Sequence, residues 1–387
     1  MKRKVYVIAI LVALLATPVA SAFQDPNAVS QPQSLSAAPE ELSFVTEVAG
    51  SSLNCRRATR EDARTLSSGD AVERHVITPV SRTGAGGLTI TLRATQQLES
   101  FPEAKAAFLA AAARWESLIS APISIVIDVD FGPNFFGRLF PTFVLGATNT
   151  QSLIGAGIYG YVRNGLIAGA SNPQEALLYD RLPAESVRTD IGQTTTFLSP
   201  SANFRALGLI SPVADPQGEM PFFGPPPKIG FNTSFPFDFA PSDGIDPDKI
   251  DFDAVATHEI GHVLGFESNV GLKEFRPTFP TALSVLDLFR FRPDIILPLF
   301  GVDERILSSG GEQIFFAGSL KIEFSTGRLD GTGGDGFQAS HWKLIVVNPH
   351  QPPIGIMVPS IDFGERIVIT RNDLRAFDAI GYRLNSP

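Results

Sequence analysis

The chain has 387 residues, of which 44% are hydrophobic and 18% are charged, so it can bury a large core and is not a disordered protein. The formal net charge of −9 argues against nucleic acid as a partner. Because Cys55 is the only cysteine, an intramolecular disulfide is excluded.

The first 22 residues have the pattern of a signal peptide. A basic start, Lys2-Arg3-Lys4, precedes an apolar stretch over 5–16 and a small-residue cleavage site, Ala20-Ser21-Ala22. The alternative is a membrane anchor, which the short apolar stretch disfavours. No later stretch is long and apolar enough to span a bilayer. We therefore expect a secreted protein, periplasmic or extracellular, without membrane attachment once the signal is removed.

Residues 23–85 differ in composition from the rest. Residues 23–45 are rich in Ser, Pro, Ala and Gln, and a charged run follows Cys55. We interpret 23–85 as a prosegment or N-terminal extension. We place an N-terminal lobe at 86–265 and a C-terminal lobe at 266–387.

The start of the N-terminal lobe has clear periodic patterns. Leu88–Leu92 alternates like a strand with one buried face, and Ile123–Val129 has the β-branched content of a central strand. Between them, Ser100–Glu103 has the S-x-x-E form of a capping box. The helix expected after it carries a core-facing stripe at spacings of three and four. The stripe comprises Phe101, Ala104, Phe108, Ala111, Trp115 and Leu118.

The next hundred residues predict shorter elements. We expect strands at 143–147 and 157–162, a short helix within 172–186, a proline-rich loop at 211–227 and a last strand within 228–239. One such strand could be a sheet edge that pairs with an extended peptide, but the sequence does not identify which.

An acidic loop follows the last of these strands. It contains Asp238, Asp243, Asp246 and Asp248. We interpret it as a solvated turn with helix caps, because a calcium site, although possible, has no recognisable spacing here.

The most informative stretch is 257–266, Thr-His-Glu-Ile-Gly-His-Val-Leu-Gly-Phe. His258 and His262 lie four residues apart and so share one helix face, where both imidazoles can bind one cation. Glu259 lies close enough to hold a water as general base. Zinc suits this arrangement because it takes imidazole nitrogen and keeps a position open for water. The alternative is a surface helix with two solvated histidines, but Asp251 and Asp253 stand where an N-cap belongs and Gly265 stands where the helix would end.

Two histidines do not complete a catalytic zinc site, which normally has three protein ligands. The remaining candidates are His75, His341, His350, Glu267 and Glu274. His75 lies in the extension and His350 in a proline-rich stretch. His341 follows a glycine-rich loop and precedes Gly355–Pro359.

The run His258–Gly265 resembles the metzincin metallopeptidases, H-E-x-x-H-x-x-G. In most of them a histidine three residues after the glycine is the third ligand, but Ser268 stands there. The order of motifs resembles a subgroup, the leishmanolysin-like peptidases, in which an insertion precedes the third histidine and a Met-turn follows. On this resemblance His341 is the third ligand and Met357 is the Met-turn residue beneath the zinc.

The resemblance implies an α+β fold of the metzincin type. It has an N-terminal lobe with a mixed twisted sheet and two long helices, and a smaller irregular C-terminal lobe that ends in a helix, here capped by Thr370–Asp373. It also implies a secreted zinc endopeptidase that cleaves proteins or peptides with Glu259 as base. Many metzincins are held latent by a prosegment thiolate, so Cys55 is a candidate switch; an unpaired thiol in a flexible leader is the alternative.

Two other functions compete with this one. A secreted binding or surface protein on a catalytically degenerate scaffold would explain Ser268 if His341 is not a ligand, but the intact Glu259 argues against it. A metallohydrolase with a carboxylate as third ligand is disfavoured because no N-E-x-x-S-D-like run follows the helix. The sequence does not indicate an oligomeric state.

Overall fold

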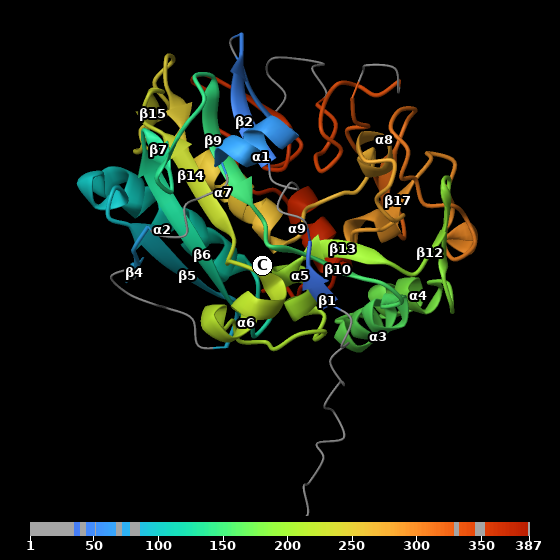
Figure 1. The fold of residues 1–387 in the computed structure, drawn as a ribbon. Coiled ribbons are helices and arrows are strands. Elements are labelled where there is room, and N and C mark those ends of the chain that lie inside the picture. Colours follow the sequence, from blue (N-terminus) through green and yellow to red (C-terminus); the bar gives the residue numbers. More distant parts are fainter. Residues whose placement is uncertain are drawn as a thin grey trace, which may run out of the picture. The chain divides into compact units, whose positions relative to one another are not determined.

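A computed structural model describes residues 35–38, 44–50, 52–66, 72–77, 86–328, 333–344 and 353–385 (Figure 1). The signal-peptide interpretation of 1–22 lies outside these residues, and so does His350. The described residues all belong to one unit, 31–387. Among their helices, none is long and apolar enough to cross a membrane.

An eight-stranded mixed sheet is the largest layer of the molecule. Its strands, in spatial order, are β20 (Ser360–Asp362), β3 (Ser52–Arg57), β2 (Phe44–Ala49), β9 (Val144–Asn149), β14 (Lys228–Asn232), β6 (Ser124–Gly132), β5 (Thr89–Thr95) and β4 (Arg74–Ile77). Strands β5, β6 and β14 are parallel, and the other neighbours are antiparallel. The strands expected at 88–92, 123–129 and 143–147 are confirmed as β5, β6 and β9.

Two long helices, α2 (Pro102–Leu118) and α7 (Phe252–Leu264), pack on each other and on this sheet (Figure 1). The Phe108 ring meets Phe252 edge-on at 5.0 Å, and the Trp115 indole donates to the Thr257 carbonyl at 2.9 Å. Four residues of the expected stripe are fully buried, namely Ala104, Phe108, Ala111 and Trp115. This packing fixes α7 against the sheet.

The capping box expected at Ser100–Glu103 is wrong. Ser100 ends a short 3₁₀ turn, η2 (Leu98–Ser100), and Phe101 stands at the N-cap without a side-chain hydrogen bond. Pro102 then begins α2, because its fixed φ suits the first helical position and it has no N–H to satisfy.

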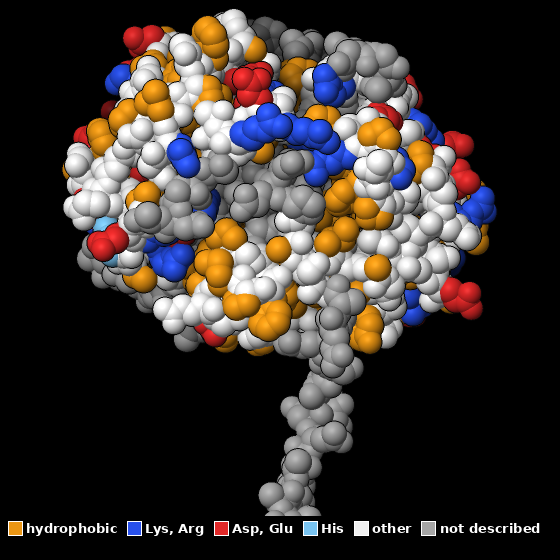
Figure 2. All heavy atoms as spheres, in the orientation of Figure 1, with side chains coloured by type: hydrophobic (Ala, Val, Ile, Leu, Met, Phe, Trp, Pro, Cys, Tyr) orange, Lys and Arg blue, Asp and Glu red, His pale blue; other side chains and the backbone are white. Residues whose placement is uncertain are grey.

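The N-terminal extension is built into the main sheet. Its hairpin of β2 and β3 lies between β9 and β20, and β4 pairs with β5 at the opposite edge. Arg74 of β4 forms an ion pair with the buried Asp128 at 2.9 Å. Helix α1 (Arg60–Leu66) follows the hairpin, and a row of basic side chains lies over this region (Figure 2). The extension therefore supplies three strands of the main sheet, including β4 at one edge, while β20 forms the other edge.

Two expectations between β9 and α7 are wrong, and one is refined. Residues 157–162 begin helix α3 (Tyr159–Gly169), whose buried Tyr159, Val162 and Leu166 have helical spacing rather than strand alternation. The loop expected at 211–227 contains α6 (Pro216–Phe223), capped by Asp215. The strand expected within 228–239 divides into β14 and β15. The other elements here are β7 (Asn134–Phe135), β8 (Arg138–Leu139), β10 (Ser152–Gly155), α4 (Pro173–Asp180), β11 (Val187–Thr189), β12 (Gly192–Thr194), β13 (Phe197–Pro200), α5 (Ser201–Ala206), β15 (Phe237–Asp238) and β16 (Ile250–Asp251), and β1 (Leu35–Ala37) pairs with β10.

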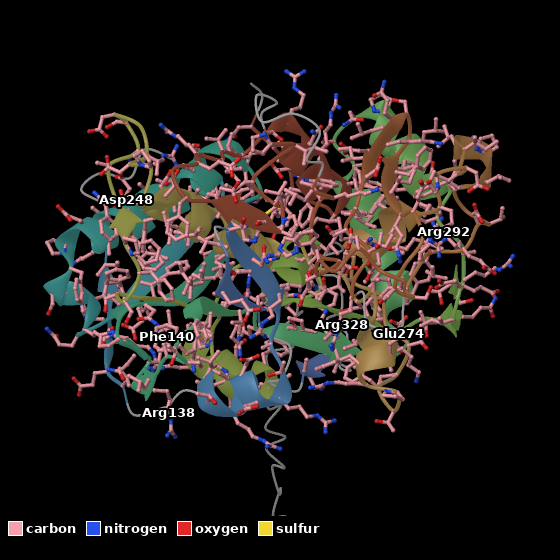
Figure 3. The ribbon with its side chains drawn as sticks, turned by 90° about the horizontal axis from the view of Figure 1, so that it is seen from above. Arg138, Phe140, Asp248, Glu274, Arg292 and Arg328 are labelled. Atoms are coloured by element: carbon pink, nitrogen blue, oxygen red, sulfur yellow. The ribbon has the colours of Figure 1, made fainter. Side chains whose placement is uncertain are left out.

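The chain after α7 is less regular. It contains α8 (Leu272–Phe275), η3 (Leu286–Phe289), η4 (Leu297–Leu299) and a three-stranded sheet of β17 (Arg290–Phe291), β18 (Ile314–Ala317) and β19 (Leu320–Glu323). In Figure 3, Glu274, Arg292 and Arg328 mark this side, and Asp248 and Arg138 mark the side of the main sheet. The last helix, α9 (Arg371–Ala379), has the expected capping box between Thr370 and Asp373. The fold is therefore mixed α+β with a large mixed sheet.

Candidate metal centre

Helix α7 carries two histidines on one face. The Asp251 carboxylate accepts from the Ala254 amide at 3.0 Å and caps the start, and Gly265 ends the helix with φ of +121°. Every residue of the helix is buried. The caps at Asp251 and Gly265 are confirmed, whereas Asp253 lies in the first turn and pairs with Arg114 at 2.7 Å. The four-residue spacing brings His258 and His262 together on one face.

Three imidazoles meet at this face. The Nε2 atoms of His258 and His262 lie 3.0 Å apart, and the Nε2 of His341 lies 3.2 Å from that of His262 and 3.3 Å from that of His258. All three side chains are buried. His341 comes from 79 residues further along the chain than His262.

The second ring nitrogen of each histidine bonds a backbone carbonyl. The three Nδ1 atoms lie 2.8 Å from the carbonyl oxygens of Ile356, Phe266 and Gln338. A carbonyl only accepts, so each Nδ1 carries the proton and each Nε2 presents its lone pair. Burial and the neighbouring His258 lower the pKa of His262 and of His341 well below the usual histidine value, which favours neutral rings. Three converging lone pairs repel one another unless a cation lies among them.

Cys55 completes a set of four donors. Its Sγ lies 3.7 Å from the Nε2 of His262, and the four donor atoms all lie within 4.8 Å of one another. Tetrahedral zinc, with bonds of roughly 2.0–2.1 Å to nitrogen and 2.3 Å to sulfur, would separate its ligands by about 3.3–3.6 Å. The spacings therefore fit a metal. Burial, and next the charge of Glu259, raise the pKa of the Cys55 thiol, whereas a coordinated dication favours thiolate.

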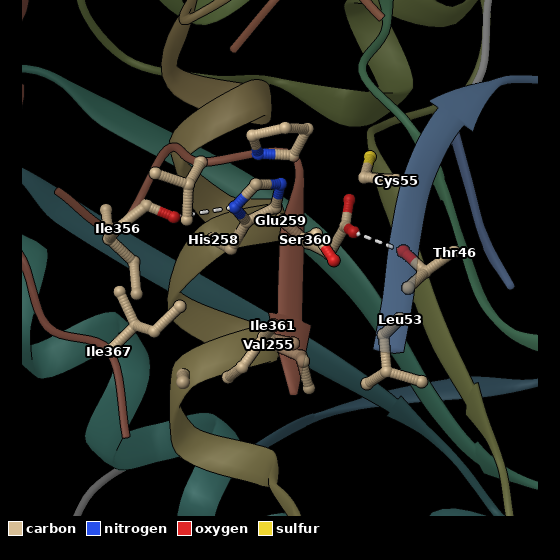
Figure 4. A pocket seen from close by; sticks show the side chains of 13 residues that line it. Thr46, Leu53, Cys55, Val255, His258, Glu259, Ile356, Ser360, Ile361 and Ile367 are labelled. Carbon is tan, nitrogen blue, oxygen red and sulfur yellow. Dashed lines mark hydrogen bonds between the residues drawn. The ribbon is translucent and has the colours of Figure 1, made fainter. Parts of the chain in front are cut away.

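Glu259 lies beside the cluster with one oxygen bonded and one free. Its Oε1 accepts from the Thr46 hydroxyl at 2.9 Å. Its Oε2 is buried and has no hydrogen-bond partner among the described residues. A cavity of about 30 Å³ adjoins it, and its largely apolar lining includes Leu53, Val255 and Ile361 (Figure 4). This space is sufficient for one water, which needs roughly 10–15 Å³.

Met357 lies buried against the metal helix. A Cβ added at Gly261 would meet the Met357 Sδ at 2.5 Å and Trp115 at 3.4 Å. Gly261 is the helical residue directly before His262, so the thioether packs against the turn of α7 that carries the second histidine. The Met357 carbonyl also accepts from the Trp342 amide at 2.9 Å, which connects it to the residue after His341.

The other sequence candidates for the third ligand lie outside the cluster. The His75 Nε2 pairs with Glu99 at 2.6 Å, Glu267 accepts from the Ser152 hydroxyl at 3.2 Å, and Glu274 accepts from the Ser309 amide at 2.8 Å. Ser268 donates to Asp287 instead of ligating. Among the candidates that the structure describes, these contacts leave His341 as the third histidine of the site; His350 lies outside the described residues.

The acidic loop does not form a metal site in the part of the chain that the structure describes, where the Cys55–histidine group alone qualifies. Asp238 accepts from the Ala240 and Asp246 amides, and Asp246 pairs with Lys249 at 2.6 Å. These contacts are those of a turn, as expected, but Asp238 is buried rather than solvated, and the helix that follows is capped by Asp251 instead.

Two parts of the site could not be expected from the sequence. Thr46 lies in a leader without motifs, and only the register of the hairpin, which places it opposite Cys55, brings it to Glu259. Asp373 was expected only as a helix cap. It also accepts from the Ile356 and Met357 amides and from the Trp342 indole. No local pattern signals these long-range contacts.

Comparison with known proteins finds no family model, no curated protein and no solved structure that matches this chain. The class of the site therefore follows from its own geometry. That geometry defines a buried cluster of one cysteine and three histidines that could hold a metal ion. A separate cavity of about 470 Å³ lies nearby, lined by residues that include Arg57, Glu274 and Gln338.

Proposed function

We propose that the chain is a secreted zinc-dependent endopeptidase of the metzincin class, resembling the leishmanolysin-like subgroup. His258, His262 and His341 would hold zinc, and Glu259 would be the general base. The observation that carries this proposal is the convergence of three lone-pair nitrogens at 3.0–3.3 Å. Imidazole and thiolate donors at near-tetrahedral spacing favour zinc.

The residues around the site have distinct tasks in peptide hydrolysis. A zinc ion held there would supply Lewis acidity and make water more acidic. Glu259 would take the proton of the attacking water through Oε2 and pass it to the leaving amine. The carbonyls of Ile356, Phe266 and Gln338 would keep the three imidazoles in the tautomer that ligates.

Strand β9 is suited to bind an extended peptide. One edge of β9 pairs with β14, and the other edge pairs antiparallel with β2 of the extension, next to the metal cluster. A substrate strand that replaced β2 would gain the same main-chain hydrogen bonds beside Glu259. This arrangement supports peptides and proteins as substrates once the hairpin has left.

The hairpin covers the metal donors and the base together. Thr46 and Cys55 stand directly opposite each other, so their side chains share one face of the hairpin. Thr46 reaches Glu259, and Cys55 lies beside the histidine cluster (Figure 4). The Phe44 ring stacks on His262 at 4.2 Å. We propose that this is a latent form, in which Cys55 blocks the position that the reaction needs.

The test compares the intact chain with a chain trimmed by limited proteolysis near residue 85. We expect about one zinc per chain, and casein or peptide cleavage that appears only after trimming. The matched Glu259→Gln protein should bind zinc and stay inactive after the same treatment. A preparation without zinc would contradict the proposal, and so would a trimmed chain that holds zinc but cleaves no peptide.

The role of Cys55 has its own test. Cys55→Ala in the intact chain should raise cleavage above the parent level, because one donor no longer occupies the metal. Cys55→Ser, which keeps the size but is a weaker zinc ligand, is the matched variant. If both intact variants remain as inactive as the parent, Cys55 does not act as a switch.

One observation favours a second candidate function, a secreted binding or surface protein. The hairpin is a full member of the main sheet, and four protein ligands are typical of structural zinc sites. The orphaned oxygen of Glu259 favours catalysis instead, because a purely structural site has no use for it. Zinc that stays bound without any cleavage, whatever the trimming, would favour the binding protein.

A further inference from the structure

The third histidine is brought to the site by contacts within the 266–340 segment. Two stretches of chain must meet there: the exit from α7 at 266–269, and 339–342, which carries His341. The two stretches are connected by a hydrogen bond in which the Ser268 backbone amide donates to the Ser340 hydroxyl at 2.7 Å. Ser268, which occupies the usual ligand position, is therefore part of the support for His341.

Asp287 holds the first of these stretches. Its Oδ1 accepts from the Ser268 hydroxyl at 2.6 Å, and its Oδ2 accepts from the Asn269 amide at 2.9 Å. The Ser284 amide donates to the same carboxylate at 2.9 Å. Asp287 is fully buried, so these bonds do not compete with water.

Arg290 holds the second stretch. It forms an ion pair with Asp287 at 3.6 Å, and its Nη2 donates to the Ala339 carbonyl at 2.5 Å. Its Nη1 lies 3.3 Å from the Ser325 carbonyl, and the Ser325 amide donates to the His341 carbonyl at 3.0 Å. The guanidinium also stacks over Phe324 at 3.8 Å. Arg290 thus contacts the chain directly at Ala339, two residues before His341, and reaches the His341 backbone indirectly through Ser325.

We propose that the buried Asp287–Arg290 pair positions His341 and thereby sets the affinity of the metal site. This inference rests on the proposed zinc site and extends it to two positioning residues. A buried ion pair adds little net stability compared with apolar residues of similar size, so stability alone does not account for it. Its bonds instead connect the exit of the metal helix to Ala339, two residues before His341.

The test uses Arg290→Lys and a matched control, Arg305→Lys. Arg305 is equally buried in the same segment and also stacks on phenylalanines, but its guanidinium donates to the Leu288 and Asp303 carbonyls. Lysine keeps the charge and loses the planar fork in both variants. Zinc affinity is measured by chelator competition on the full chain, and ligand geometry by the absorption spectrum of the Co²⁺ form.

We expect Arg290→Lys to raise the zinc Kd by about 10- to 100-fold and to alter the Co²⁺ spectrum, as loss of an outer-shell support does. Arg305→Lys should lower the melting temperature but leave the zinc Kd and the spectrum near the parent values. If Arg290→Lys does not fold, Asp287→Asn, which keeps the side-chain shape, replaces it with the same expectation.

Equal shifts in zinc Kd for the Arg290 and Arg305 variants would overturn the positioning role. An unchanged Kd and spectrum in a folded Arg290→Lys or Asp287→Asn protein would do the same. A parent chain that binds no zinc would refute the metal site itself. If only the positioning role is wrong, the parent will bind zinc tightly and the Arg290→Lys and Asp287→Asn proteins will bind it with the same Kd.

Discussion

The two ligands on α7 and the two donors from elsewhere differ in how their positions are fixed. His258 and His262 are placed by one helical turn, with caps at Asp251 and Gly265. His341 and Cys55 lie 79 and 207 residues away from His262 and arrive through tertiary contacts. The positions of His258 and His262 thus depend on a single helix, whereas those of His341 and Cys55 depend on packing between segments far apart in the sequence.

Removal of His341 should have the largest effect on the zinc content of the chain. We expect His341→Ala to lose stoichiometric zinc, because two imidazoles and a removable thiol do not retain it. His75→Ala, which removes a half-exposed histidine outside the cluster, should keep full zinc content. Elemental analysis of both purified proteins decides the point.

Ser268→Ala adds a second control, since Ser268 occupies the usual position of the third ligand yet donates to Asp287. It should retain about one zinc per chain. Loss of zinc from Ser268→Ala, with retention in His341→Ala, would reverse the ligand assignment.

A substitution on helix α7 should separate catalysis from metal binding. We expect Glu259→Gln in the trimmed enzyme to lower the rate of peptide cleavage by about 10²–10⁴-fold, the usual contribution of a general base. Zinc content and melting temperature should stay near the parent values, since Glu259 is not in the ligand set. Full activity in this variant would refute the assignment of the base.

The smallest predicted effect concerns the packing of Met357 against helix α7 at Gly261. Gly261→Ala places a methyl group where the Met357 sulfur now lies, so we expect a loss of about 1–3 kcal/mol in the free energy of unfolding. Gly160→Ala is the matched control, because this helical glycine has open space around its Cβ position. It should be neutral or slightly stabilising.

Denaturant unfolding of both glycine variants measures the difference. If Gly261→Ala is as stable as the parent, Met357 does not pack tightly against the metal helix. That result would contradict the close contact between Met357 and Gly261 on α7.

The sequence predicted the parts of the molecule that depend on short-range patterns. Periodicity placed β5, β6 and the buried stripe of α2, and spacing placed His258, Glu259 and His262 on one capped helix. His341 was chosen by elimination and resemblance, and the structure brings it to the other two histidines.

Other features could not be predicted because they arise only from tertiary contacts. The hairpin around Cys55 has no local signal for its place in the main sheet, and Thr46 depends on the register of that hairpin. The strand expected at 157–162 is instead the start of α3, because a short apolar run has no decisive period. Asp287 and Arg290 were missed because a buried ion pair in an irregular segment looks like any other charged pair in sequence.

The most direct test of the account is X-ray absorption spectroscopy at the zinc edge on the purified intact chain. The account predicts one zinc with three nitrogen neighbours from imidazole at about 2.0–2.1 Å and one sulfur at about 2.3 Å. The sulfur contribution should vanish in Cys55→Ala while the imidazole signal stays. A chain without bound metal, or a metal whose neighbours include no imidazole, would contradict it.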